Sequence, residues 1–142
     1  MFKTIVLALD GSEGSRAAIP IATELARQNG GRIVIAHAEQ YVVGKGGAPV
    51  PPTEDEIQAE LRRQAEELSK EGIDTRVEIR NVVLGGPAHV IAEIADEANA
   101  DLIVAGTHGH TALGGLLLGS VTQRLLHIAH RPVLAVPPRD RS

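Results

Sequence analysis

Cysteine is absent from this 142-residue chain, and aromatic residues are nearly absent, with one phenylalanine, one tyrosine and no tryptophan. The lack of cysteine excludes disulfides, thiolate metal sites and a cysteine nucleophile. The scarcity of aromatic rings and a formal net charge of −4 argue against a protein that stacks on bases or binds the phosphates of a nucleic acid. We therefore expect no nucleic-acid partner.

Long hydrophobic runs are also lacking. The apolar stretches span only a few residues each, too short to cross a bilayer. The amino-terminal segment Met1-Phe2-Lys3-Thr4-Ile5-Val6 is not followed by the small-residue cleavage site of a signal peptide. We therefore expect a cytoplasmic protein with no membrane partner. The length suits one domain, residues 1–142, large enough to bury a core without covalent links.

Short apolar runs alternate with helical periodicity along the chain, which predicts an α/β fold. The expected arrangement is a doubly wound, Rossmann-like sheet of five parallel strands with helices on both faces. One run alternates apolar and charged residues, as an edge strand does, and this favours the strand order 3-2-1-4-5. The expected strands cover residues 4–9, 32–38, 75–83, 101–105 and 132–136.

The last expected strand raises a question about assembly. In this order it forms the second edge of the sheet, yet Val133-Leu134-Ala135-Val136 is apolar at every position. An apolar edge needs cover, and antiparallel pairing with a second copy would provide it. We therefore expect a homodimer through residues 132–136.

The first expected helix follows Asp10-Gly11-Ser12 and ends at Gly30-Gly31. Ser12 or Ser15 can cap it. Its periodicity places Ala18, Ile21, Ala22 and Leu25 in the core. Pro20 falls inside this helix and is expected to kink it, because proline removes a backbone hydrogen bond.

A second irregular stretch precedes the next helix. Residues 44–52 are rich in glycine and proline, and we interpret them as a disordered linker; a lid formed with Tyr41 is the alternative. Thr53 and Glu56 then form a capping-box pattern. The helix that follows has an apolar stripe at Ile57, Leu61, Ala65 and Leu68, and Gly72 can cap its end.

The richest functional signal is the glycine-rich loop of residues 106–119, which follows the fourth strand. The predicted strand order brings this loop beside the loop after the first strand, at the switch point where such sheets bind ligands. Glycines let the backbone approach an anion, and the helix that starts at Gly119-Ser120 directs its dipole to the same place. The hydroxyls of Ser120 and Thr122 would add donors. Residue types alone leave a phosphate cradle and a plain glycine-rich turn equally open.

The loop also carries a family resemblance. Gly106-x2-Gly109-x9-Gly119-Ser120 matches the G-2x-G-9x-G(S/T) ATP-binding signature of the universal stress protein family, which this chain resembles over nearly its whole length. Further matches in order are Asp10-Gly11-Ser12, His37-Ala38, the segment 100–106 and the segment 131–137. The resemblance implies the five-stranded fold, a dimer through the last strand, and binding of ATP, ADP or AMP with Mg²⁺.

The resemblance also implies roles for residues. Gly106, Gly109, Gly119 and Ser120 would hold the triphosphate, and the main chain of Ala38 would meet adenine. Asp10 would lie near ribose, phosphate or a bound Mg²⁺; capping of the first helix is its alternative role. The complete implied binding set is Ala8, Leu9, Asp10, Ala38, Ala105, Gly106, Thr107, His108, Gly109, Gly119, Ser120, Val121 and Thr122.

The remaining histidines carry weaker signals. His108 and His110 lie two residues apart without a third metal ligand nearby, so contact with phosphate or solvent is favoured over zinc. His37 follows a buried strand and can be a core or crevice histidine. His127 and His130 are expected in the last turns of a helix, where the dipole favours a cation.

Catalytic machinery is not evident. The chain has no Gly-x4-Gly-Lys-Ser/Thr motif, no lysine in the glycine-rich loop and no acidic residue between Gly106 and Arg131, so a water-activating group is missing there. We therefore favour a nucleotide-dependent stress-response switch with slow or no hydrolysis. The alternatives are a weak ATP hydrolase that uses Asp10 and Mg²⁺, and a scaffold that binds no ATP or holds a cyclic nucleotide.

Overall fold

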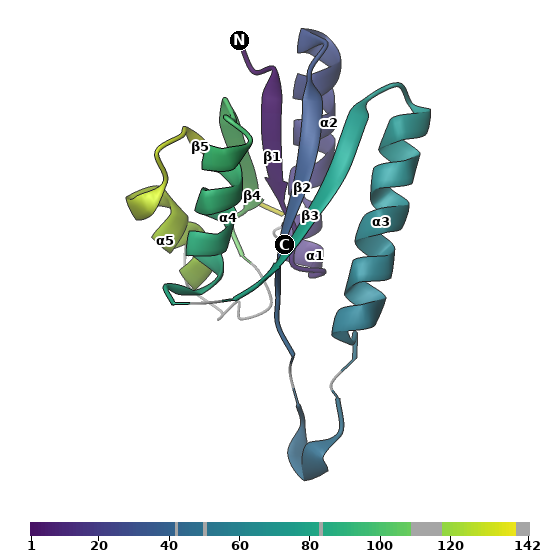
Figure 1. Cartoon of the computed structure of the whole chain (residues 1–142), viewed down its shortest axis with the longest axis vertical. Coiled ribbons are helices and arrows are strands. Elements are labelled where there is room, and N and C mark those ends of the chain that lie inside the picture. Colours follow the sequence, from purple (N-terminus) through teal and green to yellow (C-terminus); the bar gives the residue numbers. More distant parts are fainter. Residues whose placement is uncertain (42, 50, 83, 109–117, 139–142) are drawn as a thin grey trace.

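The computed structural model describes residues 1–41, 43–49, 51–82, 84–108 and 118–138. Its five strands form one parallel sheet in the order β3-β2-β1-β4-β5, which confirms the predicted topology (Figure 1). The strands are β1 (Thr4–Ala8), β2 (Arg32–Glu39), β3 (Asp74–Asn81), β4 (Leu102–Gly106) and β5 (Val133–Val136). The α-helices are α1 (Glu13–Arg16), α2 (Ala18–Asn29), α3 (Glu54–Lys70), α4 (Gly86–Glu97) and α5 (Ser120–Ile128).

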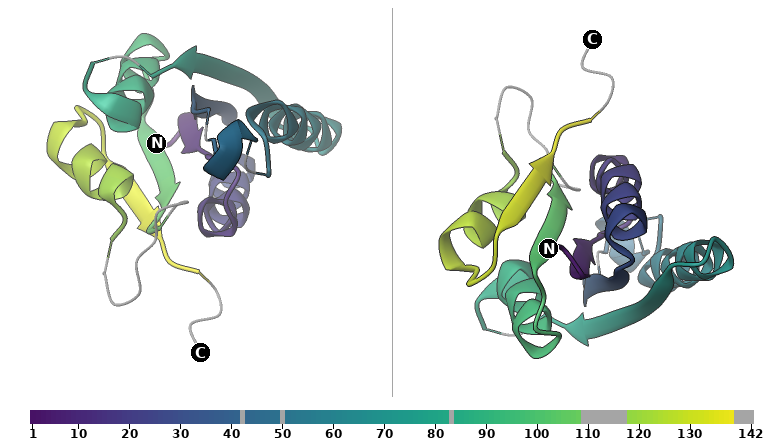
Figure 2. Two further views of the ribbon diagram at one scale, coloured as in Figure 1. Left: turned by 90° about the horizontal axis from the view of Figure 1, so that it is seen from below. Right: turned by 90° about the horizontal axis from the view of Figure 1, so that it is seen from above.

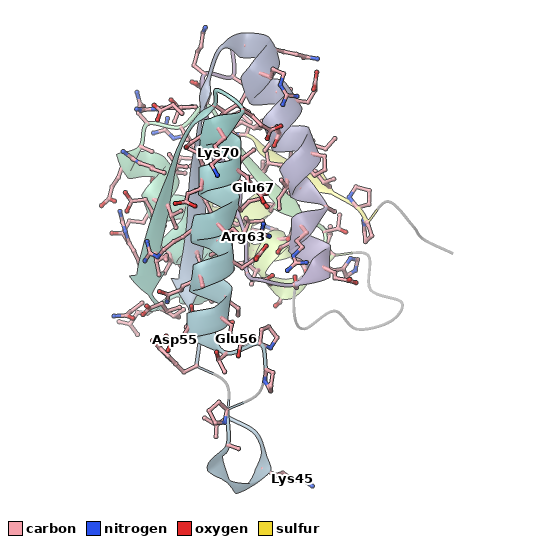
Figure 3. The ribbon with its side chains drawn as sticks, turned by 90° about the vertical axis from the view of Figure 1, so that its right-hand side faces the viewer. Lys45, Asp55, Glu56, Arg63, Glu67 and Lys70 are labelled. Carbon is pink, nitrogen blue, oxygen red and sulfur yellow. The ribbon has the colours of Figure 1, made fainter. Side chains whose placement is uncertain are left out.

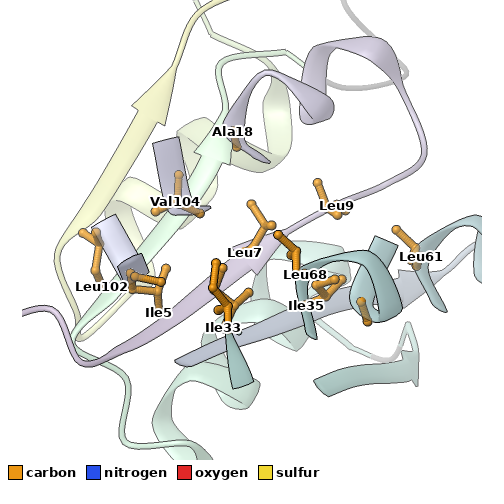
Figure 4. Packing of buried hydrophobic residues seen from close by; sticks show 14 of the residues in the cluster. Ile5, Leu7, Leu9, Ala18, Ile33, Ile35, Leu61, Leu68, Leu102 and Val104 are labelled. Atoms are coloured by element: carbon orange, nitrogen blue, oxygen red, sulfur yellow. The ribbon is translucent and has the colours of Figure 1, made fainter. Parts of the chain in front are cut away.

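Helices cover both faces of the sheet, with α2 and α3 on one face and α4 and α5 on the other (Figures 1 and 2). Because side chains alternate along a strand, each central strand contributes to two cores. The face under α2 and α3 carries large aliphatic side chains, seen in Figure 4 (Ile5, Leu7, Leu9, Ile33, Ile35, Leu102 and Val104). The face under α4 and α5 carries smaller ones (Val6, Ala8, Val34, Ala36, Ala38, Ile103 and Ala105).

The segment after β1 differs from the prediction. It forms two helices that meet at Ala17, not one helix kinked at Pro20. Ser12 caps α1 by accepting a hydrogen bond from Ser15 N at 3.1 Å. Pro20 is the third residue of α2, where the backbone nitrogen has no intrahelical acceptor, so proline costs nothing there.

The buried face of α2 is also only partly as predicted. Ala18 and Ala22 are buried and Leu25 packs against the same core, but Ile21 is 40% exposed. The small side chains of Ala18, Ala22 and Ala26 repeat every four residues, so they form the stripe that faces the sheet. Ile21 lies to one side of that stripe.

Helix α3 agrees with its sequence pattern. Thr53 Oγ1 accepts a hydrogen bond from Glu56 N at 3.3 Å, and Gly72 follows the helix with φ +90°. The predicted stripe of Ile57, Leu61, Ala65 and Leu68 is buried. The opposite face is charged and solvent-exposed, and Arg63 there pairs with Glu60 and Glu67 (Figure 3).

The expected disordered linker instead contains a compact turn. Lys45–Gly47 form a 3-10 turn, Val43 and Pro49 form an antiparallel bridge, and Gly44 N donates to Ala48 O at 2.7 Å. The turn extends beyond the end of the sheet (Figures 1 and 3). The backbone hydrogen bond holds the two arms together, which composition alone did not indicate.

The two edges of the sheet lie where the sequence predicted. Strand β3 is half-buried, and Arg80 near its carboxyl end pairs with Glu97 of α4, with Arg80 Nη1 2.5 Å from Glu97 Oε2. Strand β5 forms the other edge, with Leu134 38% exposed. Within the ranges that the structure describes, no helix is both long and apolar enough to cross a membrane.

Candidate functional site

A crevice of about 200 Å³ opens at the carboxyl ends of β1 and β4. This is the switch point, because the chain passes from β1 to neighbours on opposite sides of the sheet. The crevice lies on the α4 and α5 side. Its lining consists of Ala8, Leu9, Asp10, Ser15, Ala38, Gln40, Pro87, Ile91, Ala105, Gly106, His108, Gly119, Ser120, Val121, Thr122 and Leu125.

The predicted binding residues therefore meet in one crevice, with two exceptions. Thr107 is 6% exposed and does not line it. Its backbone instead fixes the end of β4, because Thr107 N donates to Val136 O at 3.0 Å and Thr107 O accepts from Gly119 N at 2.6 Å. Gly109 lies outside the described residues, as does His110.

The start of α5 forms one end of the crevice. Gln123 N is bonded to Gly119 O at 3.0 Å, so the amides of Ser120, Val121 and Thr122 precede the first intrahelical bond. These amides and the helix dipole favour an anion. The Thr122 hydroxyl is already used, because it donates to Gly106 O at 2.6 Å. It therefore holds α5 against β4 and does not serve as the expected extra donor.

Gly106 allows a close backbone approach, but to another part of the chain. A Cβ built on Gly106 would lie 2.1 Å from Gly14 O, and one on Gly14 would lie 2.2 Å from His108 O. Both glycines let α1 pack directly on the end of β4. The loop thus needs glycine at 106 for packing, whatever the crevice holds.

Asp10 lies at the crevice, but the helix cap that was its alternative role is provided by Ser12. It lines the crevice, and its Oδ1 accepts a hydrogen bond from Ser12 N at 2.9 Å and one from the Ser12 hydroxyl. Ser12 in turn caps α1. Asp10 therefore orients the turn after β1 through the residue that starts the helix.

The histidine and carboxyl groups give no metal cluster. No group of three or more potential metal ligands occurs in the described part of the chain. His108 lines the crevice, and its Nδ1 lies 3.0 Å from Thr107 Oγ1. A cation here would need phosphate oxygens as further ligands, which is how Mg²⁺ is commonly held.

The other end of the crevice is apolar, and only part of it was predicted. Ala8, Ala38 and Ala105, which belong to the predicted set, form its floor, and the unpredicted Pro87, Ile91 and Leu125 form its wall from α4 and α5. The floor consists of alanine near the carboxyl end of three central strands. A larger side chain at those positions would fill the crevice.

His37 lies beneath this end and is a satisfied buried histidine. It is 2% exposed; its Nδ1 lies 2.8 Å from Leu9 O, and its Nε2 lies 2.8 Å from Glu54 Oε2. Burial raises the pKa of Glu54, but hydrogen bonds from Gln40 N, Gln58 and His37 outweigh it, so the pKa of Glu54 lies below its ordinary value. Glu54 was not among the residues predicted from the sequence.

The two histidines near the end of α5 lie outside the crevice. His127 is in the last turn, as expected, whereas His130 lies beyond the helix, which ends at Ile128 because Ala129 is extended (ψ 141°). His130 Nδ1 is 3.1 Å from Asp96 Oδ2. The hydrogen bond from His130 lowers the pKa of Asp96, burial opposes this, and Arg131 adds to the lowering.

Comparison with known proteins identifies relatives over nearly the whole chain. The profile of the universal stress protein family matches residues 1–137. A universal stress protein of Thermus aquaticus is 36% identical over 140 residues, covering 96% of this chain and 99% of its own length.

Two solved structures share the fold and contain nucleotides. A universal stress protein in complex with cAMP has a TM-score of 0.65 and 30% identity, covering 96% of this chain and 98% of its own. A universal stress protein of Archaeoglobus fulgidus in complex with dAMP has a TM-score of 0.64 and 26% identity, covering 96% of this chain and 98% of its own.

Proposed function

Because this chain belongs to the universal stress protein family, we propose that it is a nucleotide-dependent stress-response switch that binds ATP with Mg²⁺ in the crevice at the ends of β1 and β4. The observation that carries this proposal is the two-ended crevice itself. A helix start suited to phosphate lies opposite an apolar floor suited to a base.

The proposed roles follow from the chemistry of each end. The amides of Ser120 and Val121 bind phosphate oxygens, and His108 lies within the same end. Asp10 contributes a carboxylate to Mg²⁺ that the phosphates also hold. Ala38 and Ala105 offer a flat surface to the base, and Ile91 covers it from α4.

We propose slow or no hydrolysis. Among the described lining residues, Asp10 is the one carboxylate, and it already accepts two hydrogen bonds from Ser12. A residue engaged in this way orients the turn and is a poor base for water. The alternative, a weak hydrolase, requires that Asp10→Asn abolish a turnover that exceeds the background rate.

A monophosphate ligand is the second candidate, because the two structural relatives described above hold cAMP and dAMP. A crevice whose anion contacts come from backbone amides discriminates poorly among phosphates. The experiment below therefore compares ATP, AMP and cAMP directly.

The test is calorimetric titration of each nucleotide into nucleotide-free protein, with Mg²⁺ present and absent, using Gly119→Val. Gly119 has φ −71° and ψ 162°, which any residue adopts, so valine there obstructs the helix start without backbone strain. Gly44→Val is the matched control, since Gly44 is a cap with similar extended angles (φ −83°, ψ −174°) in the turn beyond the sheet.

We expect ATP binding that Gly119→Val abolishes and Gly44→Val retains. Tighter binding of cAMP or AMP than of ATP would establish the second candidate. A folded wild-type protein that binds none of the three refutes nucleotide binding.

We also propose that two copies pair through β5. The support is an edge strand whose four residues are all apolar and whose Leu134 is 38% exposed. Such an edge is a template for strand pairing unless it is covered.

A further inference from the structure

A buried pair of ionisable side chains, His37 and Glu54, lies beneath the apolar end of the crevice. Their side chains are 3% and 1% exposed. His37 comes from β2 and Glu54 from the first turn of α3, so the pair joins the sheet to that helix. Neither residue lines the crevice, and the proposed function leaves both unused.

The contacts determine where protons reside. His37 Nδ1 faces Leu9 O at 2.8 Å, and a carbonyl only accepts, so Nδ1 carries a hydrogen. Nε2 faces both Glu54 oxygens, at 2.8 and 3.1 Å. One further proton is therefore shared between Nε2 and the carboxyl group.

Glu54 accepts two other hydrogen bonds, from Gln40 N at 2.8 Å and from Gln58 Nε2 at 2.8 Å. Three donors around one carboxylate favour its ionised form. The position of Glu54 at the start of α3 also favours a negative charge. The pair therefore holds one proton more than a neutral imidazole and a carboxylate would, and that proton lies between Nε2 and the carboxyl group.

Two of these contacts end on residues that do line the crevice. Leu9 follows β1 and Gln40 follows β2. His37 holds the carbonyl of Leu9, and Glu54 holds the amide of Gln40. The bond between His37 and Glu54 therefore adds to the backbone bond from Leu9 N to Ala36 O, at 3.1 Å, in fixing the relative position of the two strand ends, and Ala38 lies between the contacts of the pair.

We propose that His37 and Glu54 are a positioning pair whose shared proton holds the base end of the crevice in its binding geometry, so that nucleotide affinity falls when that proton is lost. This inference rests on the proposed function, because it concerns the same crevice. After loss of the proton one ring nitrogen carries no hydrogen, so either Nε2 faces the carboxylate at 2.8 Å or Nδ1 faces Leu9 O at 2.8 Å. Both arrangements bring two acceptors together, and the strand ends must relax to separate them.

The surrounding charges make this loss consequential. On the same face, Glu39 reaches the pair through Gln58, Asp10 follows Leu9, and Asp55 and Glu56 lie in the first turn of α3. Arg16 and Glu60 lie on the far side of Leu9. Glu78 and Arg80 of β3 alternate to the other face, where Arg80 pairs with Glu97.

Tyr41 lies nearby, and the Glu39 charge, burial, and the Asp55 and Glu54 charges raise its pKa. In the described chain, the ion-pair partner of Glu54 is His37, whose Nε2 lies 2.8 Å from Glu54 Oε2.

Three substitutions distinguish the positioning role of the pair from the effect of its shared proton. Glu54→Gln keeps the shape, accepts from Gln40 N and can donate to a neutral His37, although it loses the bond from Gln58 Nε2. It therefore removes the need for the shared proton. His37→Asn retains a donor toward Leu9 O but not toward Glu54. His37→Gln retains a donor toward Glu54 but not toward Leu9 O. Asp96→Asn is the matched control, because it alters another histidine–carboxylate pair, with His130, outside the crevice.

The measurement is ATP affinity by calorimetry between about pH 6 and about pH 8.5. We expect wild-type affinity to fall about tenfold or more relative to Glu54→Gln as pH rises, because titration of the nucleotide is common to both. Both His37 variants should bind about tenfold more weakly than wild type at low pH, and Asp96→Asn should follow wild type throughout. Parallel profiles for wild type and Glu54→Gln would overturn the inference.

A second readout does not require a ligand. In nucleotide-free protein, nitrogen NMR should show both ring nitrogens of His37 protonated at the low end of this pH range, and the amide signals of Asp10 and Ala38 should shift as the pair loses its shared proton. If the amide signals of Asp10 and Ala38 do not shift over this pH range, the positioning role is overturned, even if ATP binds. Absence of binding with the amide shifts present would instead refute the proposed function alone.

Discussion

Substitution of Gly106 by alanine tests how the end of β4 packs against α1. The added Cβ would lie 2.1 Å from Gly14 O and 2.9 Å from Gly14 C. Both obstacles are backbone atoms, which cannot rotate away as a side chain can. To restore a separation of 3.0 Å, the two segments must move apart by about 0.9 Å.

The expected cost follows from this displacement. Overpacking a tight site costs typically 1–3 kcal/mol, and a backbone obstacle places this variant at the upper end, about 3 kcal/mol. For a domain of this size, that corresponds to a melting temperature lower by roughly 10 °C. Gly30→Ala is the matched control, because Gly30 has φ +60° but no atom within 4 Å of the added Cβ. It should cost only about 1 kcal/mol, from conformation alone.

The assay is urea unfolding of both variants, extended to Gly14→Ala and the double variant. The close approach is reciprocal, since a Cβ on Gly14 would lie 2.2 Å from His108 O. One separation of α1 from β4 relieves both contacts, so the double variant should lose less than the sum of the single losses. Equal costs for Gly106→Ala and Gly30→Ala, or strict additivity, would refute the reasoning.

Three further predictions address the crevice, the strand starts and the exposed edge. Ala38→Val should weaken nucleotide binding about tenfold in calorimetry while the melting temperature stays near that of wild type. The reason is that Ala38 is 8% exposed and lines the crevice floor. An unchanged affinity would show that Ala38 is not part of the binding surface. Asp101 Oδ2 accepts hydrogen bonds from Lys3 N and Thr4 N, each at 2.9 Å. The hydrogen bond from Thr4 lowers the pKa of Asp101; burial opposes this, and the hydrogen bond from Lys3 adds to the lowering. The ionised Asp101 therefore stabilises the fold above its ordinary pKa, and this stabilisation is lost as pH falls through the lowered value. Asp101→Asn should cost about 1–2 kcal/mol in the free energy of unfolding by urea at neutral pH. A difference between wild type and Asp101→Asn that persists to about pH 2 would contradict this. Leu134→Arg should convert a dimer to a monomer in light scattering without loss of melting temperature, because Leu134 is exposed on β5; a wild-type monomer would refute pairing through this strand.

The fold could be predicted because its signals are local. The residues of β1 after Thr4 and those of β4 are all apolar, and β3 alternates, so burial and edge position follow from the pattern. Pro20 misled because its effect depends on the helix start, which is set by the cap at Ser12 and the break at Ala17. A difference of a few residues in that start changes proline from disruptive to neutral.

The candidate site was only partly predictable for a different reason. Residues in the glycine-rich loop and the turn after β1 follow a sequence signature, whereas Pro87, Ile91 and Leu125 reach the crevice from helices whose rotation depends on packing. The Thr122 hydroxyl donates to Gly106 O, 16 positions earlier in the chain. His37 pairs with Glu54, 17 positions later. Sequence patterns report periodicity, but not which partner a polar group finds.

The unequal filling of the two sheet faces has a thermodynamic consequence. Under α2 and α3 the sheet presents isoleucine, leucine and valine, whereas under α4 and α5 four of its seven buried residues are alanine. The second face is therefore the thinner half of the hydrophobic interior, and a base bound on Ala8, Ala38 and Ala105 would complete it. A bound nucleotide would then act as a removable piece of the core, and at about 100 times its dissociation constant it would add about 2.7 kcal/mol to the free energy of unfolding. The resistance of this protein to heat and proteolysis would thereby report the nucleotide concentration around it.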